Sequence, residues 1–270
     1  SGLSPNGVPR GLTGTAIPFR YNRLDELQTI VSAHGKDLAA IVMEPIRSLK
    51  PEPGFLEGVR ALADQTGAVF IVDEISSAFR MNTGGAHLIL GIKPDIAVFS
   101  KALGNGYPIA AVIGKGYVMD AAQNSFISST YWTERIGPTA AIATIEKHRR
   151  HDVGQHLMRL GEMVQAGWVA KAAQNGVSVD VGGIPPISHF AFRAENAMTM
   201  KAFFIQCMLE KGFLASTIFY ATYAHQDEHV ERYLEAVDKA FASIAQLTKT
   251  GVLEKKMKGA PATNGFTRLA

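Results

Sequence analysis

The sequence has a single cysteine and no long apolar run, and these two absences exclude several classes of protein. Cys207 cannot form an intramolecular disulfide. It follows Phe203 and Phe204 at helical spacing, which indicates a buried structural thiol. No stretch reaches the roughly 18 apolar residues of a membrane span, and residues 1–20 lack the basic and apolar blocks of a signal peptide. We therefore expect a cytoplasmic protein without a membrane partner.

An excess of charge of one sign is also absent. The 270 residues carry 27 basic and 24 acidic side chains, which leaves a net charge of +3 without any long run of Lys or Arg. Such a balance does not favour nucleic acid as a partner. No ligand spacing typical of a metal site occurs, so the isolated His87 and His189 are expected to be structural or exposed.

Hydrophobic residues make up 47% of the chain, enough for the core of one or two globular domains. Residues 1–20 are rich in Gly, Pro and Thr and predict a loop. Asn22 is a predicted N-cap, and a helix begins after it; a second helix is predicted at 55–67. Continuous apolar strands are predicted at 38–43, between the two helices, and at 68–72, 95–100 and 109–113, after the second helix. Strands of this kind between helices are typical of a mostly parallel α/β sheet covered by helices on both faces.

The pattern changes after Pro138, where long helical stretches begin. Helices are predicted at 138–148, 155–174, 197–211 and 227–247, with short strands at 177–181 and 189–192. This order is typical of a smaller α+β domain. We place the boundary near Arg150, so that residues 1–150 form the first domain, 151–250 the small C-terminal domain, and 251–270 a loosely docked tail.

Two ionisable residues follow predicted strands of the first domain. Asp73 ends one strand, and Lys101 follows the next predicted strand by one residue. Because ligands of open parallel sheets gather at the carboxyl ends of the strands, an amine and a carboxylate at that edge suit a pyridoxal-phosphate (PLP) enzyme. On position alone, an exposed lysine and a helix-capping aspartate are the more common explanation of such a pair.

The surrounding motifs favour the enzyme. VDEI at 72–75, AFR at 78–80, KPDI at 93–96 and SKALGNGYP at 100–108 resemble, in order and spacing, the signature of class III aminotransferases and glutamate-1-semialdehyde aminomutases, which are PLP enzymes of fold type I. MEP at 43–45, PGFL at 53–56 and AHQDE at 224–228 are similar to further parts of that family. The resemblance covers most of residues 6–247 and implies a PLP-transferase fold.

The resemblance also implies a role for particular residues. Lys101 would form the Schiff base with PLP and later move a proton as acid and base, and Asp73 would pair with the cofactor's ring nitrogen. Ile75 would pack on one face of the ring, and Gly104, with Gly106, would allow a tight turn close to the cofactor. A nucleotide-binding interpretation of these glycines is weaker, since the third glycine of that motif is replaced by isoleucine.

Other positions match the family less closely. Glu44 belongs to the MEP motif and is a candidate cofactor-binding residue, but residues 48–50 stand where relatives often have an amide or carboxylate near the phenolic oxygen of PLP. Thr133 aligns with a threonine that reaches the partner subunit's phosphate site in a homodimer, although an ordinary loop threonine is the alternative. Arg47, Arg80 and Arg135 are each candidates for a substrate carboxylate or for an ordinary ion pair.

The sequence thus predicts PLP-dependent amino transfer on a small amino compound. An aminomutase of the glutamate-1-semialdehyde type and a non-catalytic remnant are the alternatives. Relatives carry an upstream segment with a loop that holds the PLP phosphate. Ser1 and Gly2 do not resemble that loop, and Tyr21 lies just before a predicted helix instead of in such a loop. We therefore expect the chain to lack the family's N-terminal part, and its activity alone to be doubtful.

Overall fold

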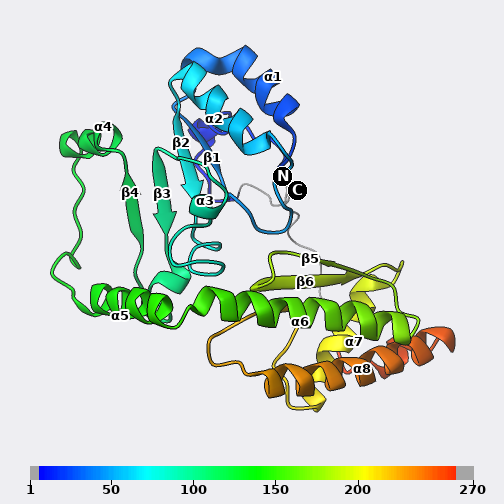
Figure 1. Ribbon diagram of the computed structural model, residues 1–270. Helices are drawn as coiled ribbons and strands as arrows, with labels where there is room; N and C mark the ends of the chain where they lie inside the picture. Colours follow the sequence, from blue (N-terminus) through cyan, green and yellow to red (C-terminus); the bar gives the residue numbers. More distant parts are fainter. Residues whose placement is uncertain (1–5, 260–270) are drawn as a thin grey trace. The chain divides into compact units, whose positions relative to one another are not determined.

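A computed structural model describes residues 6–259, and its contacts divide the chain into two compact units (Figure 1). The first unit runs to Gly154 and the second begins at Gln155. Each unit is described by itself below. No helix in the described part of the chain is long and apolar enough to cross a membrane.

The first unit contains a sheet of four strands in the order β1-β2-β3-β4 (Figure 1). These are β1 (Ala40–Met43), β2 (Val69–Asp73), β3 (Ile96–Phe99) and β4 (Ala111–Gly114). The first three strands are parallel and β4 runs antiparallel to β3. This mixed, mostly parallel sheet with helices between its strands confirms the predicted α/β fold of the PLP-transferase kind.

One face of this sheet is buried more deeply than the other. The register places Val72 beside both Met43 and Ala97, and all three side chains are buried. Helices α1 (Leu24–His34) and α2 (Phe55–Thr66) pack with Met43 and Val72 in one core, to which they contribute Leu27, Val31, Phe55, Leu56, Val59 and Ala63. The alternate positions of the strands are half-buried or exposed, and Asp73 is one of them.

The start of α1 differs from the prediction, and the end of α2 is set by a glycine. Asn22 is not the N-cap, because α1 begins after Arg23 and no side chain caps it. Asn22 instead adopts a φ of 64°, donates to the carbonyl of Lys50 and accepts from the amide of Glu52. Gly67, with φ at 73°, ends α2 in the left-handed conformation that glycine adopts without strain.

The remaining helices of the first unit follow the sheet strands. Two single-turn helices, α3 (Ala86–Ile89) and α4 (Gly116–Met119), are too short to give a periodic signal in the sequence. The long α5 (Ile136–Arg150) closes the unit. Short 3-10 turns are formed by Arg10–Leu12, Gly35–Asp37, Lys101–Leu103 and Asp120–Asn124.

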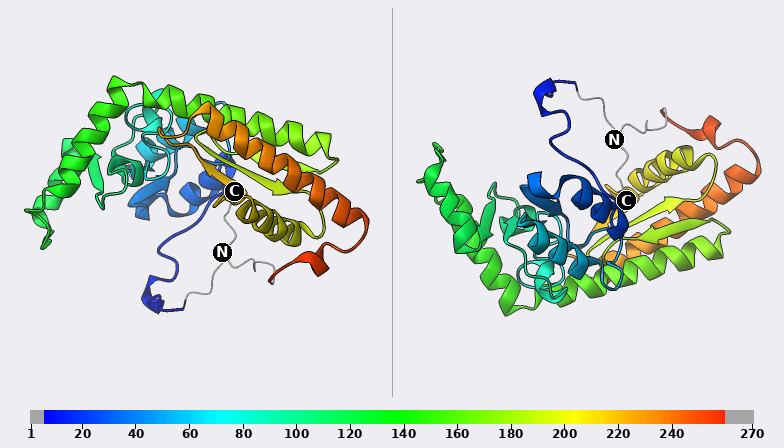
Figure 2. Two further views of the ribbon diagram at one scale, coloured as in Figure 1. Left: turned by 90° about the horizontal axis from the view of Figure 1, so that it is seen from below. Right: turned by 90° about the horizontal axis from the view of Figure 1, so that it is seen from above.

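The second unit packs three helices on an antiparallel sheet of β5 (Val179–Gly182), β6 (Ile187–Phe192) and β7 (Ile218–Tyr220). The helices are α6 (Val153–Gln174), α7 (Ala197–Glu210) and α8 (Asp227–Lys249), and α6 and α8 run side by side (Figure 2, left). Phe190 of β6 contacts an aromatic ring from each helix, namely Trp168, Phe204 and Phe241.

Two further residues complete the core of this unit. Cys207 is 8% exposed, and burial raises the pKa of its thiol, which confirms the predicted structural cysteine. Leu253 is 3% exposed and packs into the same core, just before a 3-10 turn at Glu254–Lys256. The predicted tail therefore begins with a docked residue, and its part beyond residue 259 lies outside the described residues.

Candidate functional site

The carboxyl ends of the three parallel strands bring the main candidate residues to one edge of the sheet. Glu44 follows β1 directly, Asp73 is the last residue of β2, and Lys101 follows β3 after one intervening residue. Asp73 lies beside Val98 in the β2–β3 register. In a parallel sheet these ends share one edge, so two carboxylates and an amine are delivered to the same region.

Lys101 has a strained backbone and an exposed side chain. Its φ of 47° lies in the left-handed region, which non-glycine residues rarely adopt, and such strain is concentrated at functional positions. Its Nζ atom donates a hydrogen bond to Ser76 Oγ at 2.7 Å. The carbonyl of Lys101 accepts from the amide of Asn105 at 3.1 Å, and the 3-10 turn at Lys101–Leu103 follows from that tight loop.

The loop after Lys101 requires glycine at two positions. A Cβ atom on Gly104 would lie 2.2 Å from the carbonyl oxygen of Tyr107, so any side chain there would force the loop apart. Gly106 has a φ of 107°, which L-residues with a side chain avoid. The two glycines of the SKALGNGYP motif are thus explained by the loop that holds Lys101.

Asp73 is half-buried at the end of β2. Its Oδ1 atom accepts a hydrogen bond from the amide of Ile75 at 2.9 Å, which turns the chain sharply after the strand. Ile75 is also half-buried. Within residues 6–259 no hydrogen bond joins Asp73 to Lys101, so the structure brings them to adjacent strand ends without a direct contact.

Glu74, the next residue, is fully buried and orders the loop after β2. Its carboxylate accepts from Ser77 Oγ at 2.6 Å, from the amide of His87 at 2.7 Å, and shares a 2.8 Å hydrogen bond with His87 Nδ1. Burial alone would raise the pKa of Glu74, but the hydrogen bonds from His87 and Ser77 outweigh it and hold the pKa below its ordinary value. His87 therefore acts as a structural partner of Glu74.

Ser76 is a site residue that the sequence analysis missed. It is 6% exposed, accepts from Lys101 Nζ, and makes a longer contact of 3.5 Å with Nη1 of Arg47. Arg47 in turn forms an ion pair of 2.9 Å with Glu44. The sequence feature that could have indicated Ser76 is the pair of serines at 76 and 77 within the otherwise apolar stretch 75–79; Ser76 follows Asp73 by three residues. The structure thus links Glu44, Arg47, Ser76 and Lys101.

Other predicted residues lie apart from this group. Thr133 is exposed in the turn before α5, and no hydrogen bond connects it to the other candidates in the described part of the chain. Its neighbour Glu134 accepts from the amides of Ile136 and Gly137 and so caps α5. Arg135 is exposed at the start of that helix.

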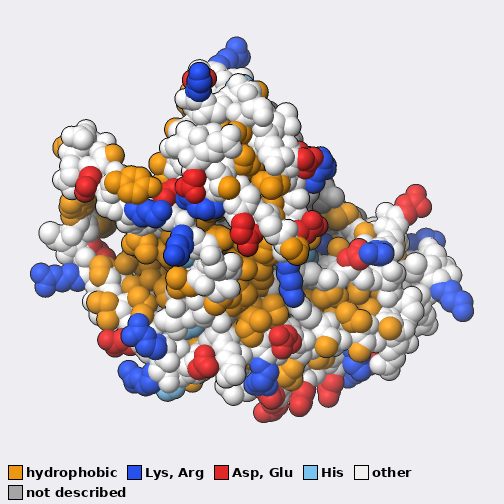
Figure 3. All heavy atoms as spheres, turned by 45° about the horizontal axis from the view of Figure 1, so that its top comes forward, with side chains coloured by type: hydrophobic (Ala, Val, Ile, Leu, Met, Phe, Trp, Pro, Cys, Tyr) orange, Lys and Arg blue, Asp and Glu red, His pale blue; other side chains and the backbone are white. Residues whose placement is uncertain are grey.

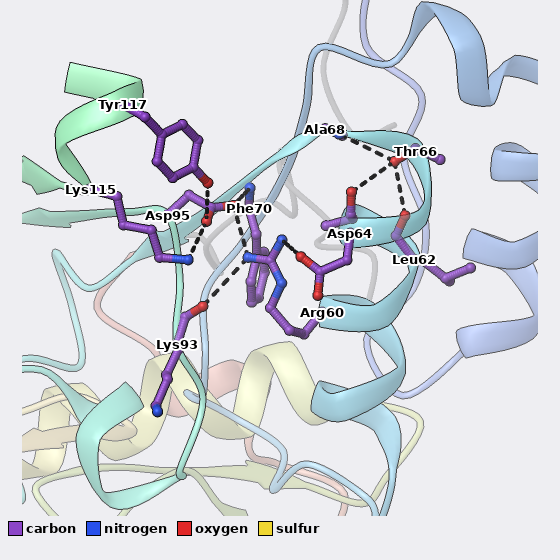
Figure 4. A network of polar contacts seen from close by, with 11 residues as sticks. Arg60, Leu62, Asp64, Thr66, Ala68, Phe70, Lys93, Asp95, Lys115 and Tyr117 are labelled. Carbon is purple, nitrogen blue, oxygen red and sulfur yellow. Dashed lines mark hydrogen bonds and ion pairs between the residues drawn. The ribbon is translucent and has the colours of Figure 1, made fainter. Parts of the chain in front are cut away.

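The strands that carry Asp73 and Lys101 are tied together at their other ends by Asp95 (Figure 4). Asp95 is 2% exposed, and its carboxylate accepts from the amide of Phe70 at 2.8 Å and from Arg60 Nη1 at 2.8 Å. Lys115 Nζ and the Tyr117 hydroxyl donate to the same carboxylate at 2.8 and 2.9 Å. This network fixes the start of β3 against β2, and hence the register of the two strands that end in the site.

Comparison with known proteins decides the family. The sequence model for aminotransferase class-III matches residues 19–241, which is most of the chain and includes every residue of the site. The chain belongs to the class III aminotransferases.

Two curated relatives show the range of chemistry in the family. A 3-aminobutyryl-CoA aminotransferase from Cloacimonas acidaminovorans (strain Evry) is 33% identical over 253 residues, covering 89% of this chain and 61% of the relative. A glutamate-1-semialdehyde 2,1-aminomutase from Natranaerobius thermophilus is 28% identical over 264 residues, again with 89% and 61% covered. The class III chain described here thus spans about 61% of the length of these relatives.

A solved structure supports the fold. The FumI protein of Sphingopyxis sp. MTA144, solved in its PLP internal aldimine form, matches with a TM-score of 0.82 and 25% identity, covering 88% of this chain and 61% of that one.

PLP is the cofactor of class III aminotransferases, and the chemistry of the strand-edge site fits it. The cofactor has an aldehyde that reacts with a primary amine and a ring nitrogen that pairs with a carboxylate. Lys101 has a primary amine and Asp73 has a carboxylate, and the two residues lie at the ends of adjacent strands.

Proposed function

We propose that this chain carries the catalytic-lysine part of a PLP-dependent class III aminotransferase that acts on a small amino compound. The observation that carries the proposal is the pairing of an exposed, backbone-strained Lys101 with Asp73 at adjacent parallel strand ends, inside family motifs. PLP, when bound, supplies an electron sink for the bond-breaking step at the substrate's amino-bearing carbon.

Individual residues of the chain have the following roles in the proposed reaction. Lys101 Nζ would hold the cofactor covalently and, once released by substrate, would act as acid and base that moves the proton between the amino-bearing carbon and C4′ of the cofactor. The negative charge of Asp73 keeps the ring nitrogen protonated. Ile75 contacts one face of the ring, Gly104 shapes the loop that holds the lysine, and Glu44 keeps the neighbouring Arg47 in place.

The two units have separate roles in this proposal. Residues 1–150 form the C-terminal part of the PLP-binding large domain, and residues 151–250 form the small C-terminal domain. The support is that the motifs that contain Asp73 and Lys101 both lie in the first unit.

A complete site is proposed to need a second copy of the chain. The segment before α5 exposes several large apolar side chains, among them Phe126 at 98%, Tyr131 at 77% and Trp132 at 68%. Hydrophobic side chains are also visible at the surface around β4 and α4, at the left of Figure 3. Burial of such a surface in a homodimer would place Thr133 at the interface, where it would contact the partner's cofactor phosphate.

The aminomutase reaction is the second candidate, because one curated relative is a glutamate-1-semialdehyde 2,1-aminomutase. The altered segment at 132–138 favours the aminotransferase instead.

We also propose a cytoplasmic location for the protein. The free thiol of Cys207 is in keeping with a reducing cytoplasm.

Reductive trapping tests the proposal directly. The chain is incubated with millimolar PLP, so that weak binding does not limit the result, then reduced with borohydride and mapped by peptide mass spectrometry. We expect the label on Lys101 and its loss in Lys101→Arg. A label spread over exposed lysines, equal in the wild type and the variant, would refute the assignment and favour a non-catalytic chain.

A further inference from the structure

His148 of α5 is a buried histidine whose two ring nitrogens both form hydrogen bonds. Its Nε2 atom lies 3.2 Å from the carbonyl oxygen of Phe79, and its Nδ1 atom lies 2.8 Å from the hydroxyl of Thr83. Because a carbonyl oxygen only accepts, Nε2 carries a proton. Burial lowers the pKa of His148 more than the Phe79 carbonyl and the charge of Asp152 raise it, which favours the neutral ring. Nδ1 then accepts the proton of the Thr83 hydroxyl, and the ring ties α5 to two points of the loop at residues 79–85.

The 79–85 loop depends on support from outside itself. Phe79 has a φ of 57°, in the left-handed region, and such a conformation persists in a bulky residue only where its surroundings enforce it. Within the loop, the amide of Phe79 donates to the carbonyl of Gly84 at 2.9 Å. Asn82 Oδ1 is buried and has no hydrogen-bond partner in the described part of the chain. The contacts inside the loop therefore leave both strain and an unmatched acceptor, and His148 supplies two bonds that keep the loop closed.

Phe79 connects this loop to the one that carries Lys101. The ring centroid of Phe79 lies 6.3 Å from that of Phe99 and 6.0 Å from that of His148. Phe79, Phe99 and Leu103 belong to one buried cluster. Phe99 is two residues before Lys101 and Leu103 is two residues after it. The left-handed backbone of Lys101 is thus held on both sides by residues that pack in the same cluster as Phe79.

We propose that His148 is a positioning residue: with Thr83 it fastens the 79–85 loop to α5 and, through the packing of Phe79 on Phe99, holds the Lys101 loop in place. The catalytic meaning of this inference rests on the proposed function of Lys101. In residues 6–259 no hydrogen bond joins His148 to Lys101, so the effect is indirect. Loss of the two bonds would allow Phe79 to leave its left-handed conformation and would loosen the cluster beneath the lysine.

Hydrogen exchange with mass spectrometry tests this role without any cofactor. His148→Leu keeps an apolar side chain of similar size but removes both bonds. Exchange is expected to accelerate roughly 10-fold or more, the effect of one or two neutral hydrogen bonds, in peptides that report the amides of Phe79 and Asn105. The Asn105 amide donates to the carbonyl of Lys101 at 3.1 Å and therefore reports on that loop. Peptides of α2, in the same unit, should exchange as in the wild type.

A variant cycle tests the partnership of the two side chains. Thr83→Val keeps the shape of threonine and removes one of the two bonds, so it should accelerate exchange in the same peptides. In the His148→Leu background Thr83→Val should have no further effect, because its partner is already absent. Circular dichroism verifies folding, and Thr83→Val provides the test by itself if His148→Leu does not fold.

Two further readouts are specific to the ring. Nitrogen NMR of His148 should show a neutral ring with its proton on Nε2 at pH 7.5. His148→Gln, whose amide both donates and accepts, should restore slow exchange in part, whereas leucine should not. Reductive trapping of PLP below saturation should yield roughly 3-fold less label, or lower still, on Lys101 of His148→Leu, because fewer molecules hold the loop in its competent state.

His156 supplies the matched control. Its Nε2 atom shares a 2.9 Å hydrogen bond with the carbonyl oxygen of His225 in the second unit. His156→Leu removes a comparable bond from histidine to backbone, and it should leave exchange at Phe79 and Asn105 unchanged.

The outcomes separate positioning from general stability and from the proposed function. Equal acceleration in α2 and in the two loops, a ring proton on Nδ1 alone, or additive effects of the two substitutions would each overturn the positioning role. Failure of the wild-type chain to attach PLP at Lys101 would overturn the proposed function, while the exchange result would still decide whether His148 holds the loop.

Discussion

Replacement of Asp95 by asparagine is expected to destabilise the first unit by about 2–3 kcal/mol. The Asp95 side chain is 2% exposed and accepts four hydrogen bonds, two on each carboxylate oxygen. Asparagine has the same shape but only one accepting oxygen, so two donors would face an amide NH₂ group. Removal of one partner from a buried ion pair costs about 3–5 kcal/mol. The expected loss lies below that range because Lys115 is 47% exposed and can turn to water.

The effect also depends on pH. Burial alone would raise the pKa of Asp95, but donation from Lys115, the Phe70 amide, Arg60 and Tyr117 outweighs it and holds the pKa well below the usual range. A carboxyl whose pKa is lower in the folded state stabilises the fold above its unfolded pKa, about 3.9. That contribution decreases as the pH falls below 3.9 toward the folded pKa. The stability difference between wild type and Asp95→Asn is therefore expected to shrink in that range.

Urea unfolding followed by circular dichroism measures the loss, and hydrogen exchange with mass spectrometry assigns it to one unit. Exchange should accelerate in peptides that contain Phe70, while peptides of α8 serve as an internal reference. Asp64→Asn is the matched control, because Asp64 pairs with the same Arg60 but is 68% exposed, and surface changes usually stay within about 0.5 kcal/mol. A loss below about 1 kcal/mol, or one equal to that of Asp64→Asn, would refute the reasoning.

Three other predictions follow from single contacts. Asp73→Asn should reduce turnover about 100-fold or more with little change in the free energy of unfolding. The asparagine side chain still accepts the 2.9 Å hydrogen bond from the backbone N–H of Ile75 but has no negative charge. A large stability loss with normal turnover would contradict this. Gly104→Ala should destabilise the loop by about 1–3 kcal/mol in urea melts, because its Cβ would lie 2.2 Å from a carbonyl oxygen, and an unchanged midpoint would show that the loop relaxes. Tyr233→Phe should cost about 1 kcal/mol, since it removes the 3.0 Å bond from Trp168 Nε1, and Trp168 fluorescence should report it.

Local patterns in the sequence predicted the order of elements and the candidate pair of the site. The continuous apolar runs correspond to β1 to β4, and helical periodicity gave α1, α2 and α5 to α8 within a few residues. These patterns are local, because burial of a strand or of a helix face leaves its mark on consecutive residues. Position after a strand, combined with the family motifs, was enough to select Asp73 and Lys101.

The same local signals failed where direction or short length mattered. An apolar run has no direction, so the sequence did not show that β4 is antiparallel to β3. The four-residue helices α3 and α4 are shorter than any period that could reveal them. Asn22 has the side chain of an N-cap, but its bonds to Lys50 and Glu52 draw it out of that role.

The sequence by itself therefore determined the family and the α/β class, and it indicated the two residues on which the proposed reaction rests. Only the tertiary structure decided which side chains surround them. Ser76 contacts Lys101 across 25 residues of sequence, and Asp95 contacts Arg60 across 35. Such pairs meet because parallel strands bring distant segments to a shared edge. No pattern among neighbouring residues records which hydroxyl or carboxylate will lie there.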